Sequence, residues 1–356
     1  MSEHRFAYKW YLKDGYPESN GLNVFGTFIC GGGSSMGYKL AGFNHLGGVE
    51  IDPKIADVYK TNHNPKHLFN EDIREFNKRI DLPKELYSLD LLDGSPPCST
   101  FSMAGSREKG WGKEKVFREG QAMQTLDDLV FVYCDTIIKL QPKVFLLENV
   151  KGIIQGNAKS YSKKIVQKMT AAGYTVQVFL LNAASMGVPQ KRERVFFIGH
   201  RKELNYPKLK MEWDERAVTF GEIYDANSDH SPLTGNSIDR WEKSKIGGQM
   251  QTKNGNFGFL TRADNNRVAP TIMGGSSSKF ALQNEPLNMS ETELKQIGTY
   301  PMDYNFKSVD PQYLIGMSVP PVMTAQIATQ IKEQWFDKCN FTSTKNRELK
   351  AVEDGI

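Results

Sequence analysis

Short apolar runs alternate with amphipathic stretches over the first two hundred residues of the chain. Continuous runs of this length are typical of strands that are buried on both faces of a sheet. The runs that predict such strands are 24–29, 47–49, 89–93, 143–150, 175–181 and 195–199. Apolar residues at helical spacing predict helices at about 120–140 and 160–172, closed by Pro142 and Gly173. This alternation predicts an α/β fold with a doubly wound sheet.

The alternation is lost after about residue 200, where the chain becomes polar and rich in spaced glycines. We expect a second, smaller domain there, and a helix over 322–335 that returns to the first domain. The large domain is therefore predicted to comprise residues 20–201 and 311–337, and the small domain residues 202–310. Residues 1–19 and 338–356 are predicted to be terminal extensions.

A thiol follows one of the predicted buried strands. The run 89–93 leads into Gly94-Ser95-Pro96-Pro97-Cys98, where two prolines stiffen a tight turn. Groups at the carboxyl ends of strands in an open α/β sheet lie where ligands bind, so Cys98 is a candidate nucleophile. The alternative is a buried structural cysteine, which is the more common role of an isolated Cys.

A glycine-rich turn lies between the first apolar run and a predicted helix. Residues 28–37 read Phe-Ile-Cys-Gly-Gly-Gly-Ser-Ser-Met-Gly, with Ser34 or Ser35 as candidate N-cap and Gly42 as the helix end. Such glycines let the backbone approach a nucleotide-like ligand, and Glu50 follows at about the 20-residue spacing of a ribose-binding carboxylate. A plain flexible turn is the alternative.

Two further polar clusters lie at the ends of predicted strands. The run 143–150 contains Glu148 and Asn149 near its end, and Arg192 and Arg194 lead into the run 195–199. Because side chains alternate along a strand, arginines two residues apart point to one face. Taken alone, Glu148 and Asn149 are better explained as polar residues at the exit of a strand than as catalytic groups. Taken alone, the two arginines are explained equally well as part of a solvated strand edge.

Together these motifs resemble those of the cytosine-5 DNA methyltransferase family. The Pro-Pro-Cys turn at Cys98, Glu-Asn-Val at 148–150 and Gln-x-Arg-x-Arg at 190–194 stand in the family's order. The resemblance runs from about residue 24 to about residue 331 and is broken only near 202–262. It implies a Rossmann-like, S-adenosylmethionine-dependent methyltransferase as the large domain and a target-recognition domain as the small one.

The resemblance assigns catalytic roles to four residues. Cys98 would add to carbon 6 of cytosine, which activates carbon 5 for the methyl group. Glu148 would hold a proton at ring nitrogen 3, and burial at the strand end would favour its protonated form. Arg194 would contact the base carbonyl oxygen, while Arg192 would help to hold the site or a phosphate. Because the target carbon is stacked in a duplex, the cytosine must be flipped out.

The implied cofactor is S-adenosylmethionine, with S-adenosylhomocysteine as product and no metal ion. Phe28 would lie against it and Glu50 would bind the ribose hydroxyls. Asp72 would approach the adenine amino group or, equally, cap a helix. The positions assigned to this pocket are Phe28, Cys30, Gly31, Gly32, Gly33, Glu50, Ile51, Asp72, Ile73, Pro97, Asn149, Met317, Ser318 and Val319.

Three positions depart from the family's pattern. Cys30 stands where glycine is usual, so the turn must accept a side chain or follow a different path. Met317 stands where asparagine is usual, which removes a polar contact near the methionine end of the cofactor. Gln296 stands where arginine is usual.

Double-stranded DNA is the implied partner, and a cognate restriction endonuclease is a candidate functional partner. Residues 99–118 are rich in Gly, Ser, Lys and Arg, and are predicted to form an active-site loop that closes on DNA. Loops of the small domain are expected to read base edges. The assigned DNA-contact positions are Ser102, Arg107, Lys109, Gln190, Lys253, Asn254 and Arg262, with Trp111, Asn256 and Arg267 as further candidates. Solvated loop residues are the alternative.

The composition is compatible with this interpretation but does not indicate it by itself. The 356 residues carry a net charge of +4, which permits a nucleic-acid partner. The four cysteines show neither metal-ligand spacing nor a disulfide framework, and no run of about 18 apolar residues is present. We therefore expect a cytoplasmic protein, associated with the nucleoid when bound to DNA, without membrane contact.

Three other functions compete with this interpretation. A tRNA cytosine methyltransferase of the same family typically carries Cys-Phe-Thr, which this chain lacks. A nicotinamide-dependent oxidoreductase also uses a glycine turn followed by an acid, but gives no reason for Cys98, Glu148 and Arg194 together. A catalytically silent DNA-binding relative would not need that trio.

Overall fold

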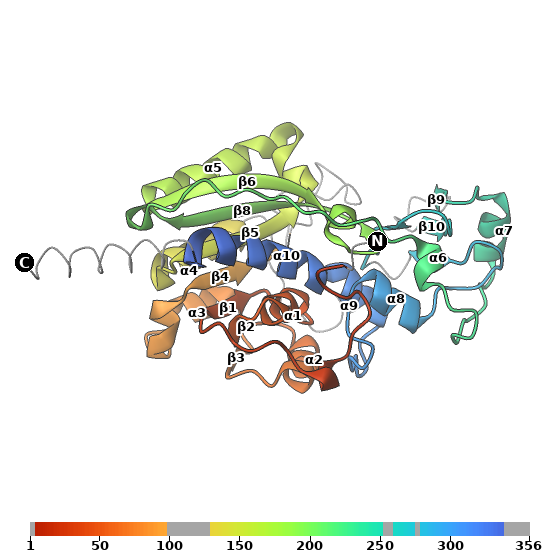
Figure 1. Ribbon diagram of the computed structural model, residues 1–356, viewed down its shortest axis with the longest axis horizontal. Coiled ribbons are helices and arrows are strands. Elements are labelled where there is room, and N and C mark those ends of the chain that lie inside the picture. Colours follow the sequence, from red (N-terminus) through yellow and green to blue (C-terminus); the bar gives the residue numbers. More distant parts are fainter. Residues whose placement is uncertain (1–3, 98–128, 252–258, 275–277, 338–356) are drawn as a thin grey trace, which may run out of the picture.

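A seven-stranded sheet forms the centre of the computed structural model, which describes residues 4–97, 129–251, 259–274 and 278–337 (Figure 1). The strands lie in the order β3-β2-β1-β4-β5-β8-β6, and β8 alone runs opposite to the other six. Their bounds are β1 Asn23–Thr27, β2 Asn44–Val49, β3 His67–Phe69, β4 Leu91–Gly94, β5 Val144–Val150, β6 Tyr174–Asn182 and β8 Glu193–Arg201. The predicted α/β class is confirmed.

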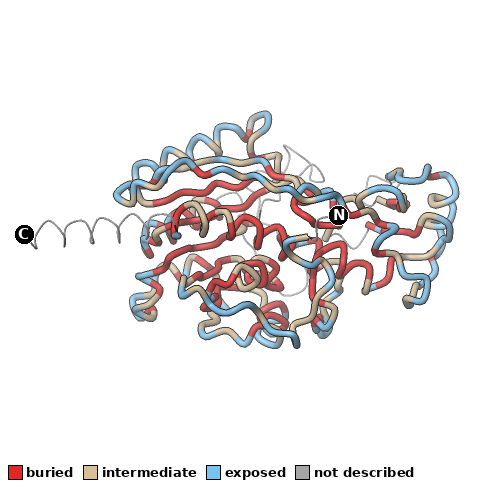
Figure 2. The backbone as a smooth tube through the Cα atoms, in the orientation of Figure 1, coloured by how far each residue is buried: buried red, intermediate tan, exposed pale blue. Residues whose placement is uncertain are grey.

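Helices cover both faces of this sheet, so its central strands are buried on both sides, whereas the edge strands β3 and β6 are partly exposed (Figure 2). The helices beside it are α1 Gly33–Leu40, α2 Pro53–His63, α3 Ile73–Lys78, α4 Leu129–Leu140, α5 Lys159–Ala171 and α10 Pro321–Ile331. Val24 and Leu91 enter the core beneath α1 and α10, whereas Phe25 and Leu92 enter the core beneath α3, α4 and α5. Strands that supply two cores read as continuous apolar runs. The start of the helix expected at about 120 lies outside the described residues.

Helix α1 begins directly after the glycine turn. Its N-cap is Gly32, which has a left-handed backbone with φ of 82°, so neither Ser34 nor Ser35 caps it as the sequence suggested. The turn closes early enough to place both serines inside the first helical turn. Gly42, with φ of 81°, follows the end of the helix as predicted.

The helix expected near the carboxyl end returns to the large sheet. α10 packs on α1, and a β-carbon at Gly37 would collide with the carbonyl oxygen of Pro321. This helix crossing therefore requires glycine at position 37. A π-helical segment, Lys332–Asp337, continues α10 and buries Trp335, whose indole nitrogen donates to the Pro207 carbonyl oxygen at 2.8 Å.

Residues 205–218 lie along the large sheet, although the sequence placed them in the small domain (Figure 1). Gln177 on β6 exchanges two side-chain hydrogen bonds with the backbone of Leu209, at 2.8 and 3.0 Å. Leu209 is buried in the core that α1 and α10 share. The hydrophobic pattern did not predict this packing, because an extended segment with little periodicity of its own can still place apolar side chains in the core of a neighbouring domain.

The amino-terminal segment is docked rather than loose over the residues described. The Trp10 indole nitrogen donates to the Thr299 carbonyl oxygen at 2.9 Å. The backbone amides of Leu12 and Lys13 donate to the Asp303 carboxylate at 2.7 and 3.0 Å. The segment thereby packs against residues 299–303.

A smaller group of elements lies at one end of the large sheet (Figure 1). It contains α6 Phe220–Ile223, α7 Asn236–Lys243, β9 Gln249–Gln251, β10 Phe259–Arg262 and β12 Lys279–Ala281. The three strands form a sheet around a core of Leu233, Leu260 and Ala281. The elements that join this group to the large sheet are β7 Gln190–Lys191, paired with β11 Ala269–Pro270, together with α8 Glu291–Ile297 and α9 Pro311–Met317. Within the described ranges, no helix is long and apolar enough to cross a membrane.

Candidate active site

Glu148 and Arg194 form an ion pair at the carboxyl end of β5. Strand β8 runs antiparallel to β5 with Arg194 opposite Val150, so Arg194 is a diagonal neighbour of Glu148 on the same face. The Arg194 Nε lies 3.0 Å from the Glu148 Oε1, and their side chains are only 15% and 10% exposed. Burial lowers the pKa of Arg194, while the Glu148 carboxylate raises it. The sequence pattern had placed both groups at strand ends, and the fold brings them together.

Asn149 points to the other face and braces the proline turn. Its amide nitrogen donates to the Pro96 carbonyl oxygen at 3.4 Å, and its side-chain oxygen accepts from the Val150 amide at 2.9 Å. Pro97 is half-buried and is the last described residue of that turn. The predicted positions that lie outside the described residues are Cys98, Ser102, Arg107, Lys109, Trp111, Lys253, Asn254 and Asn256.

Arg192 is buried between three segments of the chain. It is 2% exposed, and its guanidinium donates to the Gly316 carbonyl oxygen at 2.9 Å and to the Ile272 carbonyl oxygen at 3.2 Å. Burial and the nearby Arg194 charge lower its pKa, against the opposing effect of Glu148. Of the two roles that the sequence left open, holding the site fits this environment, and contact with a phosphate does not.

Gln190 is likewise internal, which corrects its assignment as a DNA contact. It is 1% exposed, its amide nitrogen donates to the Ile297 carbonyl oxygen at 3.2 Å, and its amide oxygen accepts from the Ile272 backbone at 3.2 Å. Both ends of the side chain are therefore used inside the protein. A surface polar residue and a buried amide at a strand start look alike in sequence.

The glycine turn has an unusual backbone at three positions. Phe28, Cys30 and Gly32 have φ of 54°, 47° and 82°. Cys30 thus adopts the left-handed conformation that favours glycine, which explains why the usual residue there lacks a side chain; keeping cysteine costs on the order of 1 kcal/mol. Burial raises the pKa of the Cys30 thiol to about 12, so it stays protonated.

Glu50 fastens this turn from the end of β2. Its two carboxylate oxygens accept from the backbone amides of Cys30 and Asp52, each at 2.9 Å. Burial raises the pKa of Glu50 to about 7, although these backbone hydrogen bonds lower it. A carboxyl group whose pKa is near 7 is present in both its charged and its neutral form at physiological pH, so it can accept or donate a hydrogen bond.

Two side chains that the sequence reasoning missed hold the turn from the opposite side. The Gly31 carbonyl oxygen accepts from the Tyr304 hydroxyl at 2.6 Å and from the His63 Nε2 at 3.2 Å. Burial lowers the pKa of His63 to about 3, so its ring is neutral. Neither residue stands in a motif, because each reaches the turn from a distant part of the chain.

Asp72 and Ile73 lie just after the adjoining strand β3, and their assignment to the cofactor pocket stays a prediction. The Asp72 carboxylate accepts from the Arg74 amide at 2.8 Å and so caps α3, one of the two roles foreseen. Ile73 is buried, whereas Ile51 is half-buried and its carbonyl oxygen accepts from Asn70 at 3.2 Å.

The segment after α9 forms another wall of the turn. Gly33 packs against the carbonyl oxygen of Val319, leaving no room for a β-carbon. The buried Ser318 hydroxyl donates to the Leu314 carbonyl oxygen at 2.9 Å and accepts from the Tyr300 hydroxyl at 2.7 Å. Met317, in contrast, is 43% exposed.

In the smaller group of elements, Arg262 is hydrogen-bonded within the protein, and its assignment as a DNA contact stays a prediction. Its guanidinium donates to the carbonyl oxygens of Gln283 at 2.8 Å and Ser244 at 3.1 Å, and it lies 4.0 Å from the centre of the Trp241 ring. Arg267 is different, since its side chain is 76% exposed. The Arg267 Nε lies 3.2 Å from the Asp264 Oδ2.

Two comparisons at the level of sequence point to one family. The C-5 cytosine-specific DNA methylase family matches residues 22–333. Type II methyltransferase M.FnuDI of Fusobacterium nucleatum is 30% identical, over 89% of this chain and 96% of that protein. Type II methyltransferase M.NgoPII of Neisseria gonorrhoeae is 27% identical, over 88% and 96%.

Solved structures share the fold. A DNA modification methyltransferase encoded within an E. coli prophage has a TM-score of 0.67 at 20% identity, over 88% of this chain and 99% of that chain. A variant of DNMT2 from Spodoptera frugiperda has a TM-score of 0.62 at 19% identity, over 89% and 100%. Because the family match spans most of the sequence, the chain belongs to the C-5 cytosine-specific DNA methylases, enzymes of the DNA cytosine-5 methyltransferase type.

Proposed function

We propose that this protein transfers a methyl group from S-adenosylmethionine to carbon 5 of a cytosine flipped out of a specific double-stranded DNA sequence. The ion pair of Glu148 and Arg194 at the carboxyl edge of the sheet carries this proposal. Asn149, next to it, is bonded to the turn that leads in the sequence to Cys98. An acid, a guanidinium and a thiol are the groups that activation of a cytosine ring requires.

The glycine turn fits the cofactor through the chemistry of its donors. The turn follows β1, Glu50 follows β2 and Asp72 follows β3, so these groups line one edge of the sheet. Nucleoside cofactors of open α/β sheets bind at this edge. We assign Phe28, Glu50 and Asp72 to adenosine and the backbone of residues 30–33 to the methionine part. S-adenosylmethionine supplies an electrophilic methyl group there.

The remaining steps use this chain's own groups. The Cys98 thiolate adds to carbon 6, and Glu148 gives a proton to ring nitrogen 3 as the ring electrons move towards carbon 5. Arg194 stabilises the resulting Glu148 carboxylate and contacts the base carbonyl oxygen. After carbon 5 has taken the methyl group and lost its proton to a base, the carbon–sulfur bond breaks and the nitrogen 3 proton returns to Glu148.

Recognition of the DNA sequence belongs, in this proposal, to the smaller group of elements. The sequence suggested residues 202–310 for this role, but the packing of residues 205–218 on the large sheet favours a start at about residue 219. Exposed side chains such as Arg267 supply the contacts, while Arg262 supports them from behind. The Type II names of the relatives favour a cognate restriction endonuclease as functional partner.

DNA that contains 5-fluorocytosine tests the chemistry, because fluorine cannot leave carbon 5 as a proton does. Wild-type protein and the control Cys339→Ser should form a covalent adduct with this DNA in the presence of S-adenosylmethionine, and Cys98→Ser should not. An adduct that persists in Cys98→Ser would reject the assignment of the nucleophile. Transfer of a labelled methyl group to tRNA instead of DNA would reject the substrate class.

A further inference from the structure

A long stretch of the chain next to the candidate active site carries positive charge alone. Residues 149–192, between Glu148 and Glu193, contain six lysines and one arginine but no Asp or Glu. Over the whole chain the two signs nearly balance, with 45 basic and 41 acidic residues. Helix α5 holds four of these lysines, whereas α2 and α7 carry residues of both signs. The excess of positive charge is therefore local to this part of the large domain.

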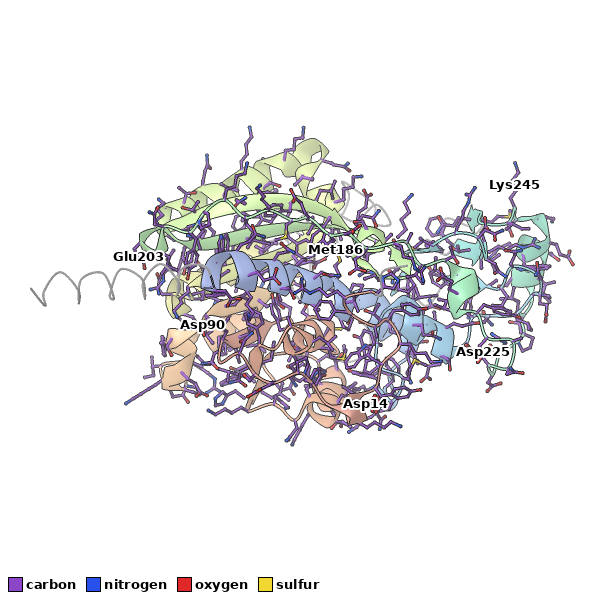
Figure 3. All side chains as sticks on the ribbon, viewed as in Figure 1. Asp14, Asp90, Met186, Glu203, Asp225 and Lys245 are labelled. Carbon is purple, nitrogen blue, oxygen red and sulfur yellow. The ribbon has the colours of Figure 1, made fainter. Side chains whose placement is uncertain are left out.

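Helix α5 begins at the edge of the sheet that carries the candidate active site. It connects β5 to β6, and these two strands run in the same direction, so the helix starts near their carboxyl ends and ends near their amino ends. At its far end, the Lys202 side chain donates to the Thr170 carbonyl oxygen at 2.9 Å. Figure 3 labels the next residue, Glu203, at the end of the molecule away from Asp225 and Lys245. The first turn of α5 is therefore the end nearer to the smaller group of elements.

Two lysines at the start of α5 are exposed and have no acidic partner. Lys159 and Lys163 stand four residues apart, so they lie on one face of the helix. Lys168, near the other end, pairs instead with Asp135 on α4 at 2.6 Å. Within the described ranges, no carboxylate lies at ion-pair distance from Lys159 or Lys163. In Figure 3, side chains that end in nitrogen project outward from α5.

This arrangement is unfavourable for the helix in the free protein. Like charges four residues apart repel each other, and a cation in the first turn opposes the helix dipole. The first turn of α5 has no acidic residue that would offset either effect. A polyanion on this face would offset both. Duplex DNA carries one negative charge per about 1.7 Å of its axis, so it presents phosphates to two lysines about 6 Å apart along a helix.

We propose that the face of α5 formed by Lys159 and Lys163 binds the phosphate backbone of duplex DNA beside the target cytosine. This inference rests on the proposed function, because that function requires the duplex to lie at the edge where Glu148 and Arg194 meet. Phosphate contacts orient a duplex without reading its sequence. The face of α5 therefore adds affinity, while the smaller group of elements supplies selectivity. Each lysine displaces counterions from DNA, so its contribution depends on salt.

The salt dependence of DNA binding tests this docking surface. Lys159→Gln/Lys163→Gln removes both charges and keeps residues that favour a helix. Fluorescence anisotropy with a labelled duplex of mixed sequence gives the association constant at several salt concentrations. The slope of its logarithm against the logarithm of the salt concentration should fall in magnitude by about 2. Lys159→Arg/Lys163→Arg keeps both charges and should keep the wild-type slope.

Lys208→Gln/Lys210→Gln is the matched control, because it changes the net charge of the protein equally. Both lysines are exposed and flank Leu209, which Gln177 binds in the first half of β6. The Lys210 amide donates to the Gln334 side chain, beyond the end of α10, at 2.9 Å. The control lysines therefore lie away from the carboxyl ends of the strands, and their loss should leave the slope in place.

Each outcome decides the proposal, because substitution of exposed lysines changes stability little and the variants should fold. A wild-type slope in Lys159→Gln/Lys163→Gln would overturn the docking surface and leave the proposed function intact. An equal fall of the slope in the control would also overturn it, since net charge alone would then explain the effect. Transfer of a labelled methyl group to genomic DNA is measured separately. A wild-type protein that methylates no DNA would reject the proposed function and this inference with it.

Discussion

Arg192→Met should lower the free energy of unfolding by about 2–4 kcal/mol, because it leaves two buried carbonyl oxygens without their donor. These oxygens belong to Gly316 and Ile272, which the guanidinium reaches at 2.9 and 3.2 Å. Each carbonyl left unpaired in the interior costs about 1–3 kcal/mol, and the packing of a methionine of similar length offsets part of that loss. Because Gly316 directly precedes Met317, the lost hydrogen bond should also distort the wall of the proposed cofactor pocket.

Urea denaturation followed by circular dichroism measures this loss, which should lower the midpoint by about 1 M. Arg267→Met is the matched control, since that side chain is 76% exposed, and its effect should stay within about 0.5 kcal/mol. A phosphate contact at Arg192 predicts the opposite pattern: wild-type stability and a salt dependence of DNA binding whose slope falls by about 1. That pattern would refute the reasoning from burial.

Three further predictions concern the pocket and the smaller group of elements. The pKa of Glu50 is raised from 4.5 to about 7, so its contribution to stability is full below pH 4.5 and is lost as the pH rises through 7. Glu50→Gln should therefore reduce the fall in unfolding free energy over this interval by up to about 3 kcal/mol, as measured by urea titrations at several pH values. Met317→Asn should tighten S-adenosylmethionine binding about tenfold in titration calorimetry, because the exposed position lets the new amide stay solvated until the cofactor arrives; equal or weaker binding would show that the departure is compensated. A chimera that exchanges residues 202–262 with a relative should melt below one that exchanges 219–262, since only the first disturbs Leu209 in the core, and equal melting temperatures would count against the boundary at 219.

Much of the fold could be predicted from the sequence because it depends on local pattern. Strands buried on both faces leave continuous apolar runs, and β5 and β8 are found where those runs lie. Alternation along a strand also puts Arg192 and Arg194 on one side. The family resemblance then supplied roles that no pattern alone would give.

The parts that could not be predicted depend on contacts between distant segments. Arg262 reads as a solvated loop cation, but Gln283, Ser244 and Trp241 enclose it in the folded chain. Asp93 ends the apolar run 89–93 and stands in no motif, although it lies on the strand next to that of Glu148. Burial of a polar group leaves no local signal, because its partners can come from anywhere in the sequence.

The packing of α10 on α1 sets the earliest time during synthesis at which the large domain can complete its folding. About 280 residues separate Gly37 from Pro321, and ribosomes add about 5–20 residues per second. For roughly a quarter of a minute to a minute, the growing chain carries α1 with Tyr38 uncovered by its later partners Val322 and Met323. Such delayed, long-range closure slows folding and leaves apolar surface open to chaperones and to other chains. Newly made chains would therefore methylate no DNA until α10 has left the ribosome.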